Sequence, residues 1–302
     1  VNAITMMNRG FRAKVAAAFD TTMQESTCIF CGQCISVCPT GALTDKESHG
    51  QGRMWQTTKV TTTCPYCGVG CNLYLHVENQ RIIGATPCES HPVSQGKLCI
   101  KGWKIHEFIQ HPERLKKPLI KKDGKFIEVS WEEALDLVAK KFKEVKETYG
   151  PRALGCLSSA KCTNEENYVM QKFARAVLKT NNVDHCARLC HASTVAGLAA
   201  AFGSGAMTNS INELSESKVI LVTGSNTTEQ HPIIGGKILH ATEKGAKLIV
   251  VDPREIQLAK FADIHLRQLS GTDVVWLNSF MHVIFEEGLE DKEYIKSNLE
   301  PE

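Results

Sequence analysis

The chain has 302 residues, enough for two or three domains with a substantial hydrophobic core. Its 35 basic and 33 acidic side chains give a formal net charge of +2, which argues against nucleic acid or an anionic membrane surface as a partner. No run of about 18 apolar residues occurs, so no membrane-spanning helix is predicted. Thirteen cysteines accompany long amphipathic segments rather than the short loops of a secreted disulfide scaffold. Metal binding in a reducing compartment, the cytoplasm, explains them better.

The first cysteine motif is a run of four with two, two and three residues between them, followed by Pro39. Its members are Cys28, Cys31, Cys34 and Cys38. This spacing is typical of bacterial-type ferredoxins, in which three cysteines hold one [4Fe–4S] cluster and the fourth ligates a second cluster. No cysteine precedes Cys28, and the chain begins with Val1 rather than Met. We therefore expect residues 1–50 to be the second half of a two-cluster module, in a piece of a longer protein.

Residues 57–113 form a second predicted domain, which is small and rich in β-structure. Short alternating segments at 72–77 and 81–83 predict strands. The domain carries a second cysteine set, made up of Cys64, Cys67, Cys71 and Cys99. Four thiolates at this spacing suit a cubane iron–sulfur cluster, and the glycines of the loop allow it to wrap around one.

A zinc site is the alternative for this second set, because four thiolates also hold tetrahedral zinc. Zinc sites favour two paired Cys-x2-Cys motifs, whereas the fourth cysteine here stands alone. Cys88 lies between Cys71 and Cys99 and could compete as a ligand. We assign the ligand role to Cys99 and leave Cys88 as a free thiol.

From residue 114 to 302, strand-like and helix-like segments alternate. Ser130 and Glu133 predict a capping box at the start of a helix that ends before Gly150. Strands are expected at 153–158, 218–223, 247–251 and 264–269, and helices at 163–179, 194–202, 232–244 and 273–287. Such alternation predicts a doubly wound α/β region with a parallel sheet covered by helices.

Cys190 and His191 are adjacent at the start of a predicted helix rich in small residues. Unpaired N–H groups at a helix start stabilise a thiolate, which is a good ligand for a soft metal. The histidine can exchange a proton near neutral pH. A buried cysteine beside a packed histidine is the commoner situation. Cys186 is given no role, and Cys156 and Cys162 are interpreted as structural.

Two strand ends in the last third of the chain predict a nucleotide site. Residues 218–232 give a strand, a tight turn and a helix start, and residues 248–252 give a second strand that ends in Asp252, with Arg254 close behind. Main-chain amides and an acid at neighbouring strand ends suit phosphates and ribose. The G-x-G-x-x-G fingerprint is absent, which argues against a standard NAD site. The alternative is a βαβ core in which Asp252 caps a helix.

Several blocks together resemble one family. The second cysteine set followed by Lys101 resembles the amino-terminal cluster domain of molybdopterin-guanine-dinucleotide oxidoreductases. Residues 158–175, 180–183 and 206–209 closely resemble the catalytic subunit of formate dehydrogenases within that superfamily. The resemblance implies Cys190 as ligand of molybdenum or tungsten, His191 as its proton partner, and Lys101 between cluster and pterin. It places the site for pterin guanine dinucleotide at Gly224, Asn226, Glu229, Asp252, Arg254, Gly271 and Asp273.

The resemblance implies a cytoplasmic formate dehydrogenase that oxidises formate to CO2, or runs the reverse reaction, at a Mo- or W-bis(molybdopterin guanine dinucleotide) centre. Electrons would leave through the cluster at the second cysteine set and then through the cluster held by Cys28, Cys31 and Cys34. The implied acceptor is an electron-transfer partner subunit of the flavin/NAD, ferredoxin or hydrogenase type. Cys38 would ligate a cluster whose other cysteines lie outside the sequence, and we expect these 302 residues alone to be inactive.

Two other functions compete with formate oxidation. One is a different molybdopterin oxidoreductase, such as nitrate reductase. The other is a non-catalytic electron-transfer subunit related to the large subunit of NADH dehydrogenase. The adjacent Cys190 and His191 favour formate dehydrogenase over nitrate reductase, and together with the pair of Asp252 and Arg254 they argue against the non-catalytic subunit.

Overall fold

The structure is a computed structural model that describes residues 2–299. The chain divides into two compact units. The first unit joins the residues up to Gln33 to those from Ile211 onward, and the second runs from Cys34 to Ser210. Within residues 2–299, no helix is both long and apolar enough to cross a lipid bilayer.

The first unit contains a three-stranded parallel sheet in the order β10-β11-β12. Its strands are β10 (Val219–Thr223), β11 (Lys247–Val251) and β12 (Ile264–Leu266). Because the strands are parallel, their carboxyl ends meet at one edge. The α-helices that follow β10 in this unit are α8 (Thr227–Gln230), α9 (Pro232–Glu243), α10 (Asp273–Glu286) and α11 (Lys292–Asn298). Strands β1 (Ile4–Met7) and β2 (Lys14–Ala17) form an antiparallel hairpin.

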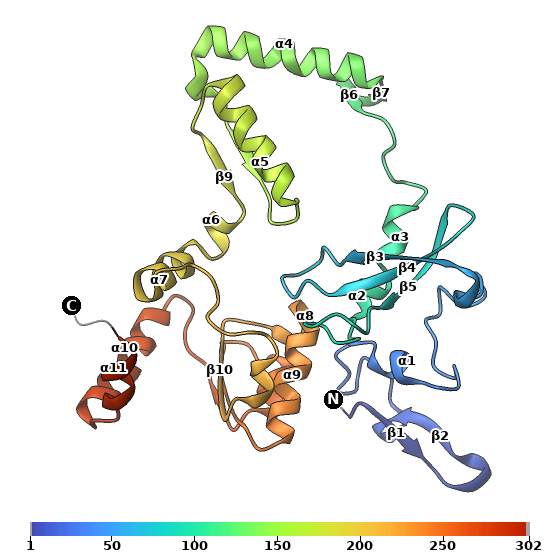
Figure 1. The fold of residues 1–302 in the computed structure, drawn as a ribbon, viewed down its shortest axis with the longest axis vertical. Coiled ribbons are helices and arrows are strands. Elements are labelled where there is room, and N and C mark those ends of the chain that lie inside the picture. Colours follow the sequence, from blue (N-terminus) through green and yellow to red (C-terminus); the bar gives the residue numbers. More distant parts are fainter. Residues whose placement is uncertain (1, 300–302) are drawn as a thin grey trace. The chain divides into compact units, whose positions relative to one another are not determined.

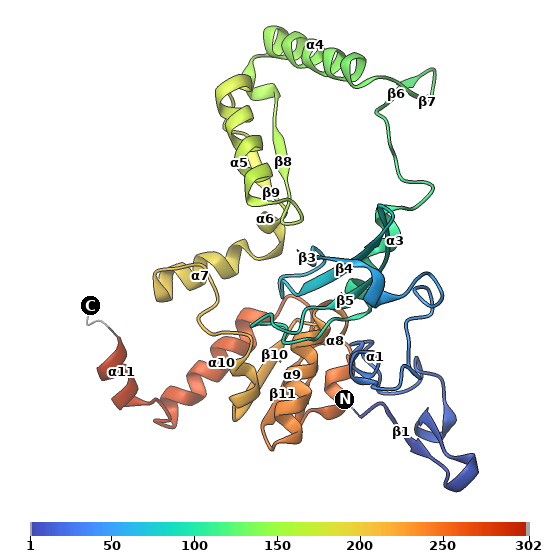
Figure 2. The ribbon, with the colours of Figure 1, turned by 45° about the vertical axis from the view of Figure 1, so that its right-hand side comes forward.

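The core of the first unit lies between this sheet and α9, which runs alongside β10 and β11 (Figures 1 and 2). Leu248 and Val250 of β11 are fully buried and contact a cluster that includes Ile238 of α9. Pro232 occupies the first turn of α9, where its missing N–H is not needed. Helices α8 and α9 approach so closely that a Cβ on Gly235 would lie 3.0 Å from the Cα of Thr228.

The second unit begins within the short helix α1 (Gln33–Val37), and an antiparallel sheet in the order β3-β4-β5 follows. The strands are β3 (Thr58–Thr63), β4 (Asn72–Glu78) and β5 (Arg81–Pro87), and the short helices α2 (Ile100–Trp103) and α3 (Ile105–Ile109) contact β5. His76 is buried in the central strand, where its ring nitrogens lie 2.8 Å from the hydroxyls of Thr57 and Thr86. Burial lowers the pKa of His76, so the residue packs as a neutral imidazole.

The rest of the second unit alternates strands and helices. The elements are β6 (Leu119–Lys122), β7 (Lys125–Glu128), α4 (Trp131–Tyr149), β8 (Cys156–Ser158), α5 (Asn164–Lys172), β9 (Val183–His185), α6 (Ala187–Cys190) and α7 (Ala192–Phe202). Strands β8 and β9 are parallel, and Cys156 belongs to the small core beside them. Ser130 caps α4 by accepting a hydrogen bond from the amide of Glu133. The Glu133 carboxylate contacts Lys122 at 3.3 Å, so it does not complete the predicted capping box.

Several predicted elements differ in extent from the observed ones, among them the strand predicted at 81–83, which extends to Pro87 as β5. The strand expected at 153–158 begins only at Cys156, because Pro151 directs residues 151–153 into a 3-10 turn. Strand β12 ends at Leu266, three residues before its predicted end. The helix expected over 163–179 is α-helical to Lys172 and then continues as a π-helix over Phe173–Leu178.

Candidate functional site

The loop between β3 and β4 carries three cysteines of the second set. Thr63 pairs with Asn72 across the hairpin, and the amide of Cys64 donates to the carbonyl of Cys71 at 2.8 Å. Between them, Gly70 adopts a left-handed conformation with φ +63°, as the turn requires. The hairpin therefore folds the segment from Cys64 to Cys71 back on itself.

Cys99 is the residue that precedes α2, and its carbonyl accepts hydrogen bonds from the amides of Gly102 and Trp103 at 2.9 and 3.1 Å. The indole of Trp103 donates to the carbonyl of Leu98 at 2.8 Å. A Cβ on Gly102 would lie 2.2 Å from Cδ1 of Leu98, so a glycine is needed at this position. Helix α2 thus fixes the backbone around the fourth cysteine.

The four thiols of the second set lie close enough to influence one another electrostatically. Cys64, Cys71 and Cys99 are buried, and Cys67 is half-buried. Burial, together with the neighbouring Cys67, Cys64 and Cys99, raises the pKa of Cys71 to about 12. Burial raises the pKa of Cys64 in the same way. Such thiols need a cationic partner to ionise, and the iron of a cluster supplies one, so this donor set fits a [4Fe–4S] cluster.

The ferredoxin-type cysteines are all half-buried, and they belong to both units. In the first unit, the amide of Phe30 donates to the sulfur of Cys28 at 3.3 Å, and Cys31 packs against the hydrophobic core. In the second unit, Cys34 lies in α1, and the sulfur of Cys38 is 3.6 Å from the hydroxyl of Thr40. Hydrogen bonds from Thr40 and from the Leu43 backbone lower the pKa of Cys38 to about 7. A sulfur surrounded by donors suits an anionic ligand.

Within residues 2–299, no group of three or more histidine, cysteine, aspartate or glutamate side chains is arranged to hold a single metal ion. The ligand roles of both cysteine sets remain predictions.

Cys190 and His191 lie at the junction of two helices in the second unit. Cys190 is the last residue of α6, and His191 precedes α7, whose Val195 amide donates to the His191 carbonyl at 2.9 Å. Both side chains are exposed. Cys186 is engaged nearby, because its sulfur accepts a hydrogen bond from the amide of Ala160 at 3.3 Å. The structure therefore places Cys190 just before the amino end of α7, as predicted, and its metal-ligand role remains a prediction.

The predicted nucleotide residues of the first unit gather at the carboxyl ends of β10 and β11. Gly224 follows β10 with φ +57°, and its amide donates to the carbonyl of Val251 at 3.2 Å. Asn226 is buried in front of α8, and its side chain accepts a hydrogen bond from the hydroxyl of Thr228 at 3.4 Å. Glu229 lies exposed on α8.

Asp252 is buried directly after β11, and its carboxylate accepts a hydrogen bond from the amide of Arg254 at 2.8 Å. The Nε atom of Arg254 lies 3.9 Å from the same oxygen. This short turn differs from the alternative in which Asp252 caps a helix. It leaves the Arg254 guanidinium mostly exposed at the strand end, where it could contact a phosphate.

The remaining predicted residues are Gly271, Asp273 and Lys101. Gly271 has φ +84°, and Asp273 begins α10, where it accepts hydrogen bonds from the side chains of Gln268 and Trp276 at 3.4 and 3.2 Å. Lys101 is half-buried in α2, two positions after Cys99. Their proposed cofactor contacts also remain predictions.

Sequence analysis did not single out two lysines that connect the cluster domain to other segments. The ammonium of Lys161 donates to the carbonyls of Pro65 and Tyr66, and the Lys161–Pro65 distance is 3.3 Å. The ammonium of Lys104 lies 2.6 Å from Asp45 and also contacts Glu47 and Glu107. Lys161 and Pro65 are 96 residues apart in sequence, and Lys104 and Glu47 are 57 apart, so no local pattern could have revealed these contacts.

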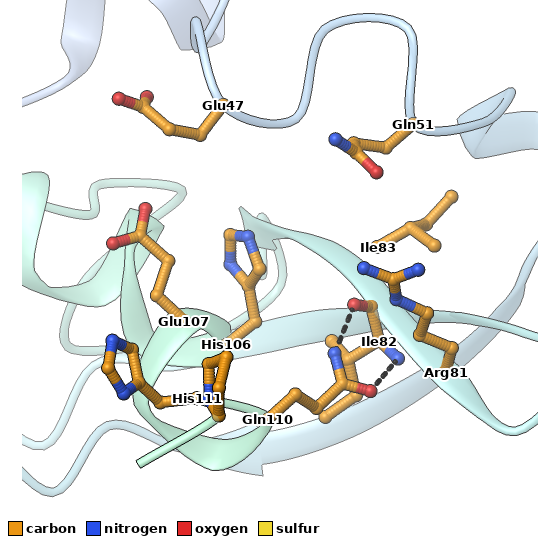
Figure 3. A pocket seen from close by; sticks show the side chains of 10 residues that line it. Glu47, Gln51, Arg81, Ile82, Ile83, His106, Glu107, Gln110 and His111 are labelled. Carbon is orange, nitrogen blue, oxygen red and sulfur yellow. Dashed lines mark hydrogen bonds between the residues drawn. The ribbon is translucent and has the colours of Figure 1, made fainter.

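A cavity of about 320 Å³ lies beside the Lys104 contacts (Figure 3). Glu47 and Glu107 line one part of it, and the guanidinium of Arg81 lines another. His106 is buried with its ring toward the cavity, and its Nδ1 has no hydrogen-bond partner among the described residues. The cavity is lined by none of the residues predicted for the site, so it is not assigned to it.

Three family descriptions match the chain. Residues 114–297 match molybdopterin oxidoreductase, residues 57–111 match the molybdopterin oxidoreductase Fe4S4 domain, and residues 22–44 match the 4Fe-4S binding domain. These matches confirm the predicted fold class, a ferredoxin-type module and a small cluster domain followed by an α/β molybdopterin oxidoreductase region. They also confirm the predicted [4Fe–4S] clusters and molybdopterin cofactor, and favour a cluster over zinc at the second cysteine set.

Individual relatives give a consistent result. The chain is 52% identical over 238 residues to F420-dependent formate dehydrogenase 1 subunit alpha of Methanococcus maripaludis, covering 79% of this chain and 35% of that protein. It is 45% identical over 249 residues to formate dehydrogenase H of Escherichia coli, covering 80% and 35%. The structure of acetylene hydratase from Pelobacter acetylenicus matches with a TM-score of 0.66 and 25% identity, covering 80% and 33%.

The chain thus spans about a third of the length of the curated relatives it matches. The molybdopterin oxidoreductase match alone extends over more than half of the chain. The Fe4S4 domain match and the structural similarity to acetylene hydratase agree with this match. The chain belongs to the molybdopterin oxidoreductase family.

Proposed function

We propose that this chain is part of the catalytic subunit of a formate dehydrogenase, which oxidises formate to CO2 or catalyses the reverse reaction. The observation that carries the proposal is the 52% identity to a formate dehydrogenase alpha subunit over 79% of the chain. The adjacent Cys190 and His191 add residue-level support, because nitrate reductases of this superfamily place a different residue after the ligand cysteine. We propose domain boundaries at residues 1–50, 57–113 and 114–302.

The metal-pterin group, when bound, supplies the two-electron oxidation of formate. The sulfur of Cys190 would hold the molybdenum or tungsten, and the imidazole of His191 would take up or release a proton beside it. The strand-end residues of the first unit would bind the guanine dinucleotide. Backbone amides after Gly224 and the guanidinium of Arg254 suit phosphates, and the buried Asp252 carboxylate suits hydroxyl or amino groups.

The cysteine sets would carry electrons away from the metal site. Cys64, Cys67, Cys71 and Cys99 would hold the inner [4Fe–4S] cluster, with the Lys101 charge between it and the pterin. Cys28, Cys31 and Cys34 would hold an outer cluster, and Cys38 would serve a further one. The acceptor would be a partner subunit of the flavin/NAD, ferredoxin or hydrogenase type, in the cytoplasm. Neither nucleic acid nor a membrane surface is proposed as a partner, given the balanced charge.

Formate-dependent reduction of a viologen dye by the full-length protein tests this proposal, together with metal analysis of the same preparation. We expect the preparation to contain iron together with molybdenum or tungsten. The activity of Cys190→Ala should be at least about 100-fold lower than that of the wild type. The matched control is Cys162→Ala, since Cys162 is also an exposed cysteine of the second unit. Iron without molybdenum or tungsten would contradict the proposal, as would full activity in the Cys190 variant.

A further inference from the structure

Lys161 lies in the turn between β8 and α5, and its side chain reaches the loop that holds the second cysteine set. Its ammonium donates to the carbonyl of Pro65 at 3.3 Å and to that of Tyr66. These two residues are the ones that separate Cys64 from Cys67. Two successive carbonyls on one ammonium fix the position of the charge relative to both cysteines.

The Lys161 charge lies beside the backbone that joins two of the thiolates. The Pro65 carbonyl that accepts from it belongs to the residue after Cys64, and the Tyr66 carbonyl belongs to the residue before Cys67. The ammonium can therefore stabilise negative charge on the sulfurs of this loop, although its own exposure to water weakens the effect.

We propose that Lys161 is a positioning residue that raises the reduction potential of the cluster held by Cys64, Cys67, Cys71 and Cys99. The inference rests on the cluster assignment made under the proposed function. One-electron reduction adds one negative charge to the cluster and its thiolates, with no bond formed or broken. A fixed ammonium stabilises the reduced state more than the oxidised state, because its interaction energy grows with the negative charge. Lys161 thereby favours electron transfer from the metal site into this cluster.

The test is a redox titration of the full-length holoenzyme, monitored by the electron paramagnetic resonance of the reduced cluster. The relevant signal is the one that disappears in Cys71→Ala. Lys161→Gln keeps a hydrogen-bond donor but removes the charge, Lys161→Met removes both, and Lys161→Arg keeps both. We expect Lys161→Gln and Lys161→Met to lower the equilibrium constant for reduction of the cluster about threefold, which corresponds to about 30 mV for a one-electron couple. Lys161→Arg should preserve the wild-type value.

A second signature is ionic strength, because a charge effect is screened by salt. The difference between wild type and Lys161→Gln is expected to shrink when salt rises from about 0.05 to about 0.5 M. Lys143→Gln is the control, since Lys143 is 77% exposed on α4, and it should leave the potential unchanged.

The possible outcomes test the role of Lys161 separately from the cluster assignment. A wild-type potential in Lys161→Gln, with or without a change in Lys161→Met, would overturn the inference, because Lys161 would then act at most as an anchor of the loop. A wild-type enzyme without any signal that Cys71→Ala removes would instead overturn the cluster assignment itself. A salt-independent shift in Lys161→Gln would also contradict an electrostatic role.

Discussion

Gly102 illustrates how closely single residues are packed around Cys99. Its position allows no side chain, because a Cβ would lie 2.2 Å from Cδ1 and 2.7 Å from Cγ of Leu98. Leu98 is only 1% exposed and cannot move into solvent. We expect Gly102→Ala to lower the free energy of unfolding by about 1–3 kcal/mol through overpacking. Urea denaturation of the full-length protein, followed by tryptophan fluorescence, measures this change.

Gly197 provides the matched control for Gly102. It lies within α7, and a Cβ there would have no atom within 4 Å. Gly197→Ala should therefore be neutral or should stabilise the helix by up to about 1 kcal/mol. Equal effects of the two substitutions would show that Gly102 is not constrained by Leu98.

The cysteines and the lysines differ in how far sequence could predict them. Sequence spacing was enough to group Cys64, Cys67, Cys71 and Cys99. The first three are close in sequence, so a turn brings them together, and the motif around the fourth identifies it as a ligand. The structure does place these four within electrostatic reach of one another. Lys161 reaches the same loop from 95 residues away. Long-range contacts of this kind depend on how elements pack, which local patterns do not encode.

At the scale of elements, Lys104 ties the segment at Asp45 and Glu47 to the junction of α2 and α3. Its ammonium lies 2.6 Å from Asp45, which is 8% exposed, while Lys104 itself is 22% exposed. We expect Lys104→Met to lower the free energy of unfolding by about 1–3 kcal/mol, because a buried carboxylate loses its partner. Lys117→Met is the control. Both members of the Lys117–Glu128 pair are 66% exposed, so loss of this ion pair should change the free energy of unfolding by less than about 1 kcal/mol.

The same contact predicts a pH dependence. Burial opposes the ionisation of Asp45, but hydrogen bonds from Lys104 and Ser48 outweigh it and lower its pKa. The stabilisation is therefore present above the unfolded pKa of about 3.9 and is lost as pH falls through the lower folded pKa. The pKa of Lys104 is raised despite burial, so its contribution is lost only as pH rises above about 10.4. Urea titrations of wild type and Lys104→Met should differ from about pH 5 to 10 and should converge progressively as pH falls from about 4 through the folded pKa of Asp45.

Element types were easier to predict than their ends. Strong apolar periodicity located β4, β10, β11 and α9 correctly, because one face of each must be buried. The start of β8 was placed too early, since the turn at Pro151 overrides the apolar character of the segment. The change from α- to π-helix at Phe173 has no local sequence signal that we could identify.

At the scale of the whole molecule, the second cysteine set and the predicted nucleotide residues belong to different units. All four cysteines of the second set lie in the second unit, whereas Gly224, Asp252 and Asp273 lie in the first. In the sequence, the match to the Fe4S4 domain precedes the match to molybdopterin oxidoreductase. Composition and motif order could predict these modules from sequence. Patterns local to each module contain no information on how the modules pack.

This separation predicts that the inner cluster can be removed without loss of the pterin metal. In the full-length protein, Cys71→Ala should eliminate about four iron atoms per chain and leave molybdenum or tungsten unchanged. Formate-dependent reduction of the physiological acceptor should fall at least tenfold, because electrons lose their route out of the metal site. Metal analysis and acceptor kinetics measure both effects, with the exposed Cys162→Ala as the control. An unchanged iron content, or loss of zinc instead of iron, would show that Cys71 does not ligate a [4Fe–4S] cluster.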